Sequence, residues 1–403
     1  MRIPPALVLF AFFSLLCSCS GGDTGEVVRP DVPGKGVMAK RTLLVYMMAE
    51  NSLSSYASSD LLEITKAAVS VPSDCRLFVY VDDVSHPYLT QFFCNSEGEG
   101  SCMTYIPFEN DVCSSDITVF SDLLDYILDD YPTEVLDLVM WSHGNGWLRA
   151  PLKSSPQRSI GIDNGKNTYS NSITRTIEIE ELAEVLKKLP ARVDRILFDA
   201  CFMQCAEVAY ALRGVADWII ASPAEIPADG APYETVAPAF FSTDGPDVIM
   251  DSYLRAYEHS SSGVVLSAIK PAAMIALADA TSYYVNKYFP RDKKREYIDA
   301  FAYLPGGAER YTCYYDANAV MSKYLTDEEF ALWRNELDKA VVYTVSSGAW
   351  YSGVIGRFLS YDVSSGCGMS MYMPQEGDLN IDFNRDFATT EWYYAAGWKL
   401  AGW

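Results

Sequence analysis

The sequence is poor in histidine and in basic residues, and it contains no apolar run of membrane-spanning length. It has only three histidines, His86, His143 and His259, which argues against a multi-histidine metal centre and makes each one a candidate for chemistry. Lys and Arg total 31 against 53 Asp and Glu, a formal charge of −22, so nucleic acid is not an expected partner. The apolar run at residues 6–16 is too short for a membrane helix.

Paired-cysteine zinc signatures are also missing. The chain has ten cysteines but no C-x-x-C pair, so we predict no structural metal centre. Cys94 and Cys102 flank a turn-rich stretch between two alternating apolar runs, which is consistent either with a disulfide across a hairpin or with two free thiols.

The N-terminal segment has the features of an export signal. Residues 1–18 end in the tripeptide Leu16-Cys17-Ser18. This tripeptide and the Cys19 that follows it resemble the bacterial lipobox. We therefore expect a lipoprotein with a lipidated Cys19, anchored to a bacterial membrane on its periplasmic face or at the cell surface. Ordinary secretion with cleavage nearby is the alternative. Residues 19–40, rich in Gly, Pro and charge, predict a flexible tether.

The rest of the chain, residues 41–403, has the 49% hydrophobic composition of a folded globular protein. Apolar β-branched runs alternate with segments of helical periodicity. This alternation predicts an α/β fold with a mostly parallel sheet covered by helices on both faces. The predicted strands are 42–48, 76–81, 136–141, 195–198, 218–221 and 264–269, and the predicted helices are 54–69, 117–128, 179–189 and 204–215.

Two predicted strands end in reactive residues, at the sheet edge where parallel sheets bind ligands. His143 follows the strand 136–141 and precedes a glycine-containing loop. Cys201 follows the strand 195–198 and precedes a helical segment, whose N-terminus favours a thiolate. A base and a nucleophile are therefore expected to meet.

These two motifs resemble those of a known family. WSHGNGW around His143, followed 58 residues after the histidine by DACFMQCAEVAY around Cys201, is similar to the clostripain family of cysteine peptidases. The segments YMMAENSL, VADWIIASPAEIPADGAPYE and SMYMP extend the likeness over about residues 41–403. The resemblance implies a caspase-like α/β/α sandwich, with a catalytic core at about 41–270 and additional helical elements in a C-terminal part at about 271–403.

The resemblance also implies a cysteine endopeptidase with a His143/Cys201 dyad. The Cys201 thiolate would attack the peptide carbonyl, and His143 would transfer the protons. The backbone N–H groups of Gly144 and Cys201 are the expected oxyanion hole, since a side chain at position 144 would crowd the scissile bond.

Two acidic residues are candidates for the substrate pocket. Asp199 lies two residues before Cys201 in an extended segment, so both side chains are expected on one face, and a cationic substrate would offset the carboxylate's effect on the thiol. Asp229 lies in the family-like PADG segment. Together they predict protein or peptide substrates with Arg or Lys before the scissile bond, in agreement with the family's basic preference.

Family members often cut themselves after the histidine, and the polar loop 148–176 offers Lys153 and Arg158 as self-cleavage candidates. No cofactor is required by this chemistry. Calcium dependence occurs in the family, and alternating Asp and Asn residues at 378–386 resemble a calcium loop. Position six is Phe383 and no glutamate closes the loop, so an exposed strand edge is the preferred interpretation.

Three alternatives use the same residues differently. A legumain-like peptidase would keep the dyad and differ in its pocket. A catalytically inactive lipoprotein would bind partners at the cell surface, and an acyl-transferring ligase would pass the acyl group to an amine.

Overall fold

The computed structural model describes residues 34–84, 87–94, 101–108, 111–149, 159–165, 176–293, 298–305, 312–377 and 381–403. Its strands, in chain order, are β1 (Ala39–Met48), β2 (Cys75–Asp82), β3 (Tyr88–Cys94), β4 (Ser101–Pro107), β5 (Thr133–Trp141), β6 (Arg192–Asp199), β7 (Ala216–Ala221), β8 (Val265–Ile269), β9 (Tyr315–Asp316), β10 (Val341–Ser346), β11 (Ala349–Ser352), β12 (Arg357–Ser360) and β13 (Ser370–Met371).

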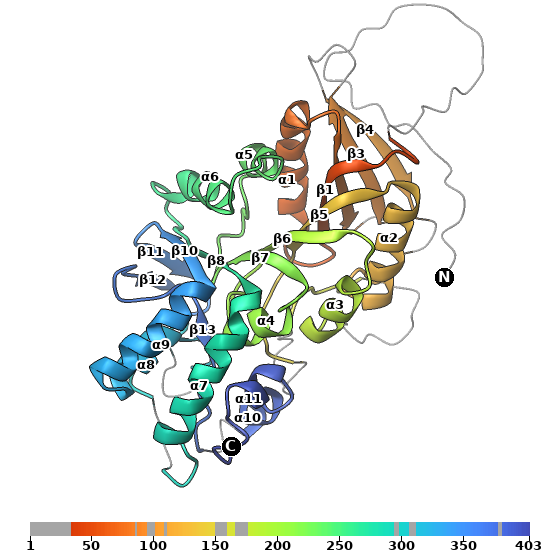
Figure 1. Cartoon of the computed structure of the whole chain (residues 1–403). Coiled ribbons are helices and arrows are strands. Elements are labelled where there is room, and N and C mark those ends of the chain that lie inside the picture. The colour runs from red at the N-terminus through yellow and green to blue at the C-terminus, as the bar shows by residue number, and fades with distance from the viewer. Residues whose placement is uncertain are drawn as a thin grey trace, which may run out of the picture.

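A nine-stranded sheet with the order β10-β8-β7-β6-β5-β1-β2-β3-β4 forms the centre of the fold (Figure 1). The five strands from β7 to β2 are parallel to one another. At each edge two more strands join by antiparallel pairing: β8 pairs with β7 and β10 with β8 on one side, and β3 pairs with β2 and β4 with β3 on the other. The predicted α/β fold with a mostly parallel sheet is confirmed for the strands that lie nearest the predicted site.

The helices, in chain order, are α1 (Ser54–Ala67), α2 (Ile117–Asp130), α3 (Ile179–Leu186), α4 (Ala206–Ala211), α5 (Tyr233–Ala239), α6 (Asp247–Tyr257), α7 (Met274–Tyr288), α8 (Ala317–Tyr324), α9 (Asp327–Ala340), α10 (Ile381–Phe387) and α11 (Glu391–Ala395), with short 3₁₀ turns at Ala68–Ser70 and Pro271–Ala273. Helix α4 is shorter than the predicted helix 204–215, because the chain after β6 first makes a tight turn.

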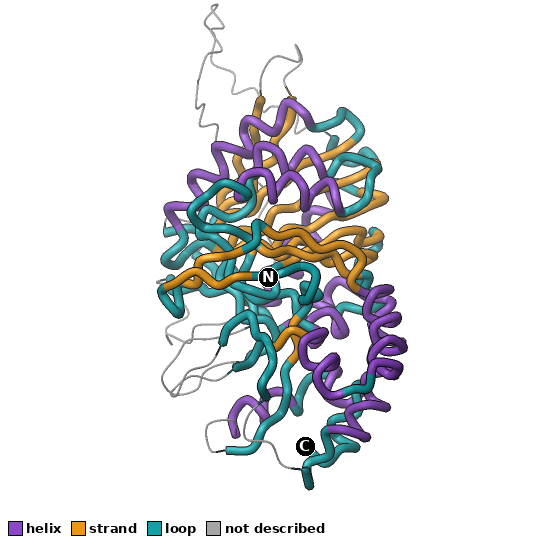
Figure 2. Tube along the Cα trace, turned by 90° about the vertical axis from the view of Figure 1, so that its left-hand side faces the viewer, coloured by secondary structure: helices purple, strands orange, loops and turns teal. Residues whose placement is uncertain are grey.

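Strand β1 explains why helices cover both faces of the sheet. Successive residues of a strand point to opposite faces of the sheet. Because the apolar residues of β1 follow one another directly, both faces carry apolar side chains that must be covered. Val45 and Met47 pack in one core with residues of α1, α5 and α6. Tyr46 and Met48 pack in a second core with residues of α2, α3, α4 and α7. Figure 2 shows the strands as a layer between helices.

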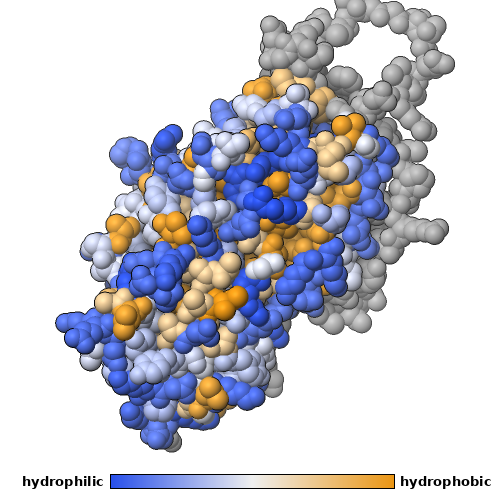
Figure 3. All heavy atoms as spheres, in the orientation of Figure 1, coloured by the Kyte–Doolittle hydropathy of each residue, from blue (hydrophilic) through white to orange (hydrophobic). Residues whose placement is uncertain are grey.

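The C-terminal part adds the predicted helical elements. Helices α7, α8, α9, α10 and α11 gather beside one end of the sheet, together with the β11–β12 hairpin (Figure 1). On the face of the molecule in Figure 3, hydrophilic side chains predominate and apolar ones form small groups between them, as expected for a chain of this net charge.

The ordered fold begins before residue 41. Strand β1 starts at Ala39, the Gly36 N–H donates to the Asp130 carbonyl at 2.8 Å, and the Arg76 guanidinium donates to the Gly34 carbonyl at 2.7 Å. The end of the predicted tether is therefore attached to the sheet.

Candidate active site

His143 and Cys201 lie just beyond the carboxyl ends of the neighbouring parallel strands β5 and β6. Trp141 pairs with Asp199 at the ends of these strands, and each predicted catalytic residue follows its strand end by two positions. The two loops are in contact, because a Cβ placed on Gly144 would lie 2.9 Å from the Cys201 carbonyl oxygen. The structure thus brings the predicted nucleophile and base to one edge of the sheet.

The turn that carries Cys201 has an unusual backbone. Phe202 is the only non-glycine residue in the described part of the chain with a positive φ, at 61°, a conformation that costs an L-residue about 1–2 kcal/mol. Its N–H donates to the Ala224 carbonyl at 2.9 Å, and its ring stacks on Tyr314 with 4.4 Å between centroids. A strained backbone conformation persists only where surrounding contacts hold it. These two contacts hold the turn at Phe202 and so fix the orientation of the preceding residue, Cys201.

Gly144 occupies a place where no side chain fits. A Cβ there would lie 2.9 Å from the Ala200 Cβ and from the Met203 sulfur, so the protein's own turn requires glycine, which is a different reason from the predicted crowding of a scissile bond. Gly144 forms a bridge with Ile160. In the hydrogen-bond network of the described residues, neither the Gly144 nor the Cys201 amide donates a bond.

The thiol and the imidazole have separate partners. The Cys201 sulfur accepts the Ile226 N–H at 3.4 Å, and Nε2 of His143 lies 2.9 Å from the Ser52 hydroxyl. No bond among the described residues joins the two groups. Burial raises the pKa of Cys201 to about 12, with smaller contributions from Glu225 and Asp199, and burial lowers the pKa of His143 below 6.5. At neutral pH both groups are therefore uncharged.

This charge state predicts a pH dependence. The rate of alkylation of Cys201 by iodoacetamide should rise about tenfold per pH unit between about pH 7 and 9, because the thiolate fraction grows tenfold per unit below the thiol pKa. Mass spectrometry of the peptide containing Cys201 measures the rate, and His143→Ala should keep the same slope. A rate that is already constant from about pH 6 would instead indicate a thiolate–imidazolium pair at rest.

Asp199 is the last residue of β6, two residues before the predicted nucleophile, and is almost completely buried. Its carboxylate accepts the Ala231 N–H at 2.9 Å, the Tyr233 hydroxyl at 2.9 Å and the Tyr253 hydroxyl at 3.2 Å. Burial raises the pKa of Asp199, and these three donors oppose the rise. Gly230 allows the close approach, since a Cβ there would lie 2.8 Å from the carboxylate.

Two further acids lie beside Asp199. Asp229 is exposed, and Asp60, which sequence reasoning missed, is buried on α1 and accepts the indole N–H of Trp141 at 2.8 Å. Burial, followed by the charge of Asp199, raises the pKa of Asp60 to about 8, and Asp229 contributes in the same direction. The structure therefore brings both predicted pocket acids together and adds a third.

Several predicted residues lie outside the described residues. These are Cys19, Lys153, Arg158 and His86. His259, which sequence reasoning did not favour as a site residue, is exposed, with 91% of its side chain accessible. No helix in the portion of the chain that is described has the length and apolar character needed to cross a membrane.

The hairpin of β3 and β4 pairs Cys94 with Ser101, and Cys102 with Phe93. The two cysteines are therefore not directly opposite, and Cys94 is a free cysteine. Of the two interpretations that the sequence left open, this favours a free thiol at Cys94.

The predicted exposed strand edge at 378–386 is wrong for residues 381–386, because residues 381–387 form helix α10. Phe383 and Phe387 are both buried. They are four residues apart, which places them on the same face of a helix. Asp382 forms an ion pair with Arg385, and the side-chain amide of Asn384 donates a hydrogen bond to the Gln375 carbonyl at 2.8 Å. The side chains of Asp382 and Asn384 thus serve α10 and its contacts, and residues 378–380 of the calcium-like pattern lie outside the described residues.

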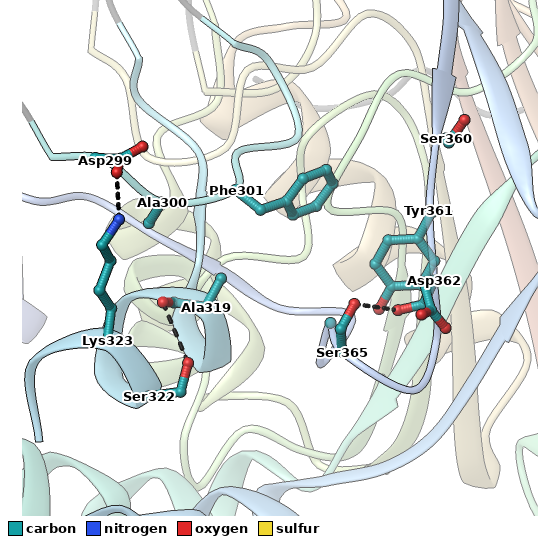
Figure 4. A pocket seen from close by; sticks show the side chains of 11 residues that line it. Asp299, Ala300, Phe301, Ala319, Ser322, Lys323, Ser360, Tyr361, Asp362 and Ser365 are labelled. Carbon is teal, nitrogen blue, oxygen red and sulfur yellow. Dashed lines mark hydrogen bonds and ion pairs between the residues drawn. The ribbon is translucent and has the colours of Figure 1, made fainter. Parts of the chain in front are cut away.

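A cavity of about 630 Å³ lies in the C-terminal part (Figure 4). It is lined by Phe301 and Tyr361 and by the ion pair of Lys323 with Asp299. Neither His143 nor any other predicted site residue lines it. This cavity is therefore separate from the candidate active site.

Comparison with known families identifies the chain. The family model described as the clostripain family matches residues 45–403. The chain belongs to the clostripain family. It is accordingly a cysteine peptidase, and the resemblance found in the sequence is confirmed. No curated protein sequence is similar enough to this family member to count as a match.

Solved structures agree with the assignment. A secreted C11 cysteine protease from Bacteroides thetaiotaomicron, in complex with an irreversible peptide inhibitor, is 30% identical, with a TM-score of 0.75, covering 90% of this chain and 100% of that one. An inactive zymogen C11 protease from Parabacteroides distasonis is 28% identical, with a TM-score of 0.74, covering 91% and 99%. These matches show that this clostripain-family chain has the fold of the C11 proteases.

Proposed function

We propose that the protein is an endopeptidase that cuts after Arg or Lys with a His143/Cys201 dyad. The observation that carries the proposal is the position of His143 and Cys201 on adjacent loops at one sheet edge, next to the buried carboxylate of Asp199 and with the N–H groups of Gly144 and Cys201 unbonded among the described residues. These are the parts that acyl transfer needs: a nucleophile, a base, donors for the oxyanion and a pocket for the substrate side chain.

In the first step the Cys201 sulfur attacks the peptide carbonyl carbon while its proton passes to the His143 imidazole. The carbonyl oxygen becomes an oxyanion, which the N–H groups of Gly144 and Cys201 stabilise. The C–N bond then breaks, and the imidazolium gives its proton to the leaving amine. Water then gives a proton to His143 and attacks the thioester carbonyl carbon. The C–S bond breaks, the carboxylic acid is released, and the imidazolium returns its proton to the Cys201 sulfur.

The proposed preference for cationic side chains follows from the acids at the pocket. The carboxylate of Asp199 is buried, and the charges of Asp199 and Asp229 both act on the neighbouring Asp60. Buried carboxylates are costly without a cation. A guanidinium or ammonium entering this pocket would compensate their charge, whereas an acidic or apolar side chain would not.

We propose further that the protein activates itself by cutting after Lys153 or Arg158. Both candidates lie in the polar loop 148–176 that follows the histidine. The zymogen from Parabacteroides distasonis is described as inactive, and such a precursor form is what activation by cleavage requires.

Export with a lipid anchor on Cys19 is also part of the proposal. It rests on the predicted signal peptide 1–18 and tether 19–40, and the Bacteroides thetaiotaomicron relative is described as secreted. Membrane attachment would leave the peptidase domain free to meet protein substrates.

A panel of fluorogenic peptides that differ only in the residue before the scissile bond tests the proposed specificity. We expect kcat/KM for Arg or Lys peptides to exceed that for Asn or Leu peptides by about 10³-fold, because an unpaired buried charge costs several kcal/mol. A preference for Asn would favour a legumain-like pocket. Cleavage of no peptide would favour the inactive binding lipoprotein, and amide products formed with an added amine would favour the ligase.

A further inference from the structure

The carboxylate of Glu225 lies beside the candidate active site but has no part in the proposed dyad. Glu225 is in the loop that follows β7. The next residue is Ile226, whose N–H donates to the Cys201 sulfur at 3.4 Å. The preceding residue is Ala224, whose carbonyl accepts the Phe202 N–H at 2.9 Å. Both sequence neighbours of Glu225 therefore contact the turn that carries the nucleophile.

One oxygen of this carboxylate is bonded and the other is not. Oε1 accepts the Val354 N–H at 3.1 Å, in the turn between β11 and β12. Oε2 is buried and has no hydrogen-bond partner among the described residues, and only 9% of Glu225 is exposed. A buried carboxylate oxygen is costly without a donor or a cation. Oε2 is therefore suited to a positively charged group from outside the chain.

Glu225 and Asp199 are held by different parts of the fold. The hydroxyl groups that donate to Asp199 come from α5 and α6. The donor to Glu225 comes from the β11–β12 hairpin, which Figure 1 shows as a separate group from those helices. Burial is the main cause of the raised pKa of the Cys201 thiol, and the charges of Glu225 and Asp199 both raise it further. The sulfur thus lies near two carboxylates that are built separately.

The hairpin beside Glu225 offers apolar surface for a long side chain. Val354, Tyr351 and Phe358 are all exposed, and the rings of Tyr351 and Phe358 contact each other with 5.4 Å between centroids. Lys and Arg side chains lay their methylene groups on such apolar surface and place the charge beyond it. An acidic or short side chain would gain neither the apolar contact nor the charge pairing.

We propose that Glu225 forms a second acidic subsite, which binds a Lys or Arg side chain of the substrate next to the residue that enters the Asp199 pocket. The inference rests on the proposed function and deepens it, because the preferred substrates then carry two basic residues in succession. Successive side chains of an extended peptide point in opposite directions. The side chain adjacent to the one in the Asp199 pocket therefore turns towards a different wall of the site, as Glu225 requires.

Peptide pairs that differ in one charge test the subsite on the full-length protein. Each peptide has Arg before the scissile bond, and carries Lys or neutral acetyl-lysine either just before that Arg or just after the bond. At one of these two positions kcat/KM should be at least about tenfold higher with Lys, because a hydrogen bond between two charged groups is strong at a buried site. Mass spectrometry of the products assigns each cut to the Arg bond.

Glu225→Gln should bring the ratio of the Lys rate to the acetyl-lysine rate close to one. The amide keeps an oxygen that can accept the Val354 N–H and removes only the charge. Should this variant fail to fold, Glu225→Asp, which withdraws the carboxylate by one methylene group, replaces it and should lower the ratio at least about threefold.

Glu184→Gln is the matched control. Glu184 is an exposed acid of α3 that pairs with Lys187 at 2.9 Å, so the net charge changes equally while the ratio should stay that of the parent. A ratio near one at both positions in the parent, or an unchanged ratio in the Glu225 variant, would overturn the subsite and leave cleavage after Arg standing. Cleavage of none of these peptides would overturn the proposed function, and the subsite with it.

Discussion

Replacing Cys201 by alanine lowers kcat/KM for Arg peptides by about 10⁴-fold or more, because the proposed acyl-enzyme forms on the Cys201 sulfur. The same variant stays a single uncut chain, since the proposed self-cleavage uses the same sulfur. Peptide assays and denaturing gels with N-terminal sequencing measure the two effects.

Cys205→Ala is the control for this experiment. Cys205 is a completely buried thiol four residues later, at the N-cap of α4, and its replacement should leave both cleavage and processing unchanged. If Cys201→Ala chains were still cut after Lys153 or Arg158, another protease would be responsible. Retained peptide hydrolysis by that variant would remove Cys201 from the mechanism.

Asp199→Asn lowers kcat/KM for Arg peptides by about 100-fold and leaves it nearly unchanged for peptides with citrulline, the uncharged analogue of Arg. The substitution keeps the shape of the side chain and removes the charge that would pair with the guanidinium, a loss of a few kcal/mol at a buried site. Comparing the two peptides separates loss of pairing from general damage.

This variant also has a structural cost. An amide nitrogen in place of Oδ2 would face the Ala231 N–H and the Tyr233 hydroxyl, so we expect about 1–3 kcal/mol of destabilisation, which thermal unfolding measures. Asp229→Asn, at an exposed position, should have a smaller effect on Arg peptides. Equal rates for the parent and Asp199→Asn would show that the pocket lies elsewhere.

The central strands could be predicted from the sequence because they are continuous apolar runs, buried on both faces. Their ends at Trp141 and Asp199 placed His143 and Cys201 correctly on neighbouring loops. The antiparallel direction of β8 could not be predicted, because an apolar run has the same appearance in either direction. The turn at Phe202 was also missed, since a positive φ at a phenylalanine depends on contacts with distant residues.

The missed site residues differ in the signal that the sequence offered. Asp60 lies on the apolar face of α1 between Ala57 and Ile64, and a buried acid there is the one local sign that sequence reasoning could have used. Ser52 has no such sign, because its partner His143 lies far along the chain. Only the sheet order, which brings β1 next to β5, makes this contact evident.

The pairing of β5 with β6 has a consequence for a processed enzyme. A cut between residues 149 and 159 would break the covalent link between the strands β1 to β5 and the strands β6 to β10. The two groups would remain neighbours in one sheet, because β5 pairs with β6 from Val135 to Trp141. The two fragments would share both cores and could part only by unfolding. The nicked enzyme would therefore elute as one particle in native chromatography and yield two bands only after denaturation.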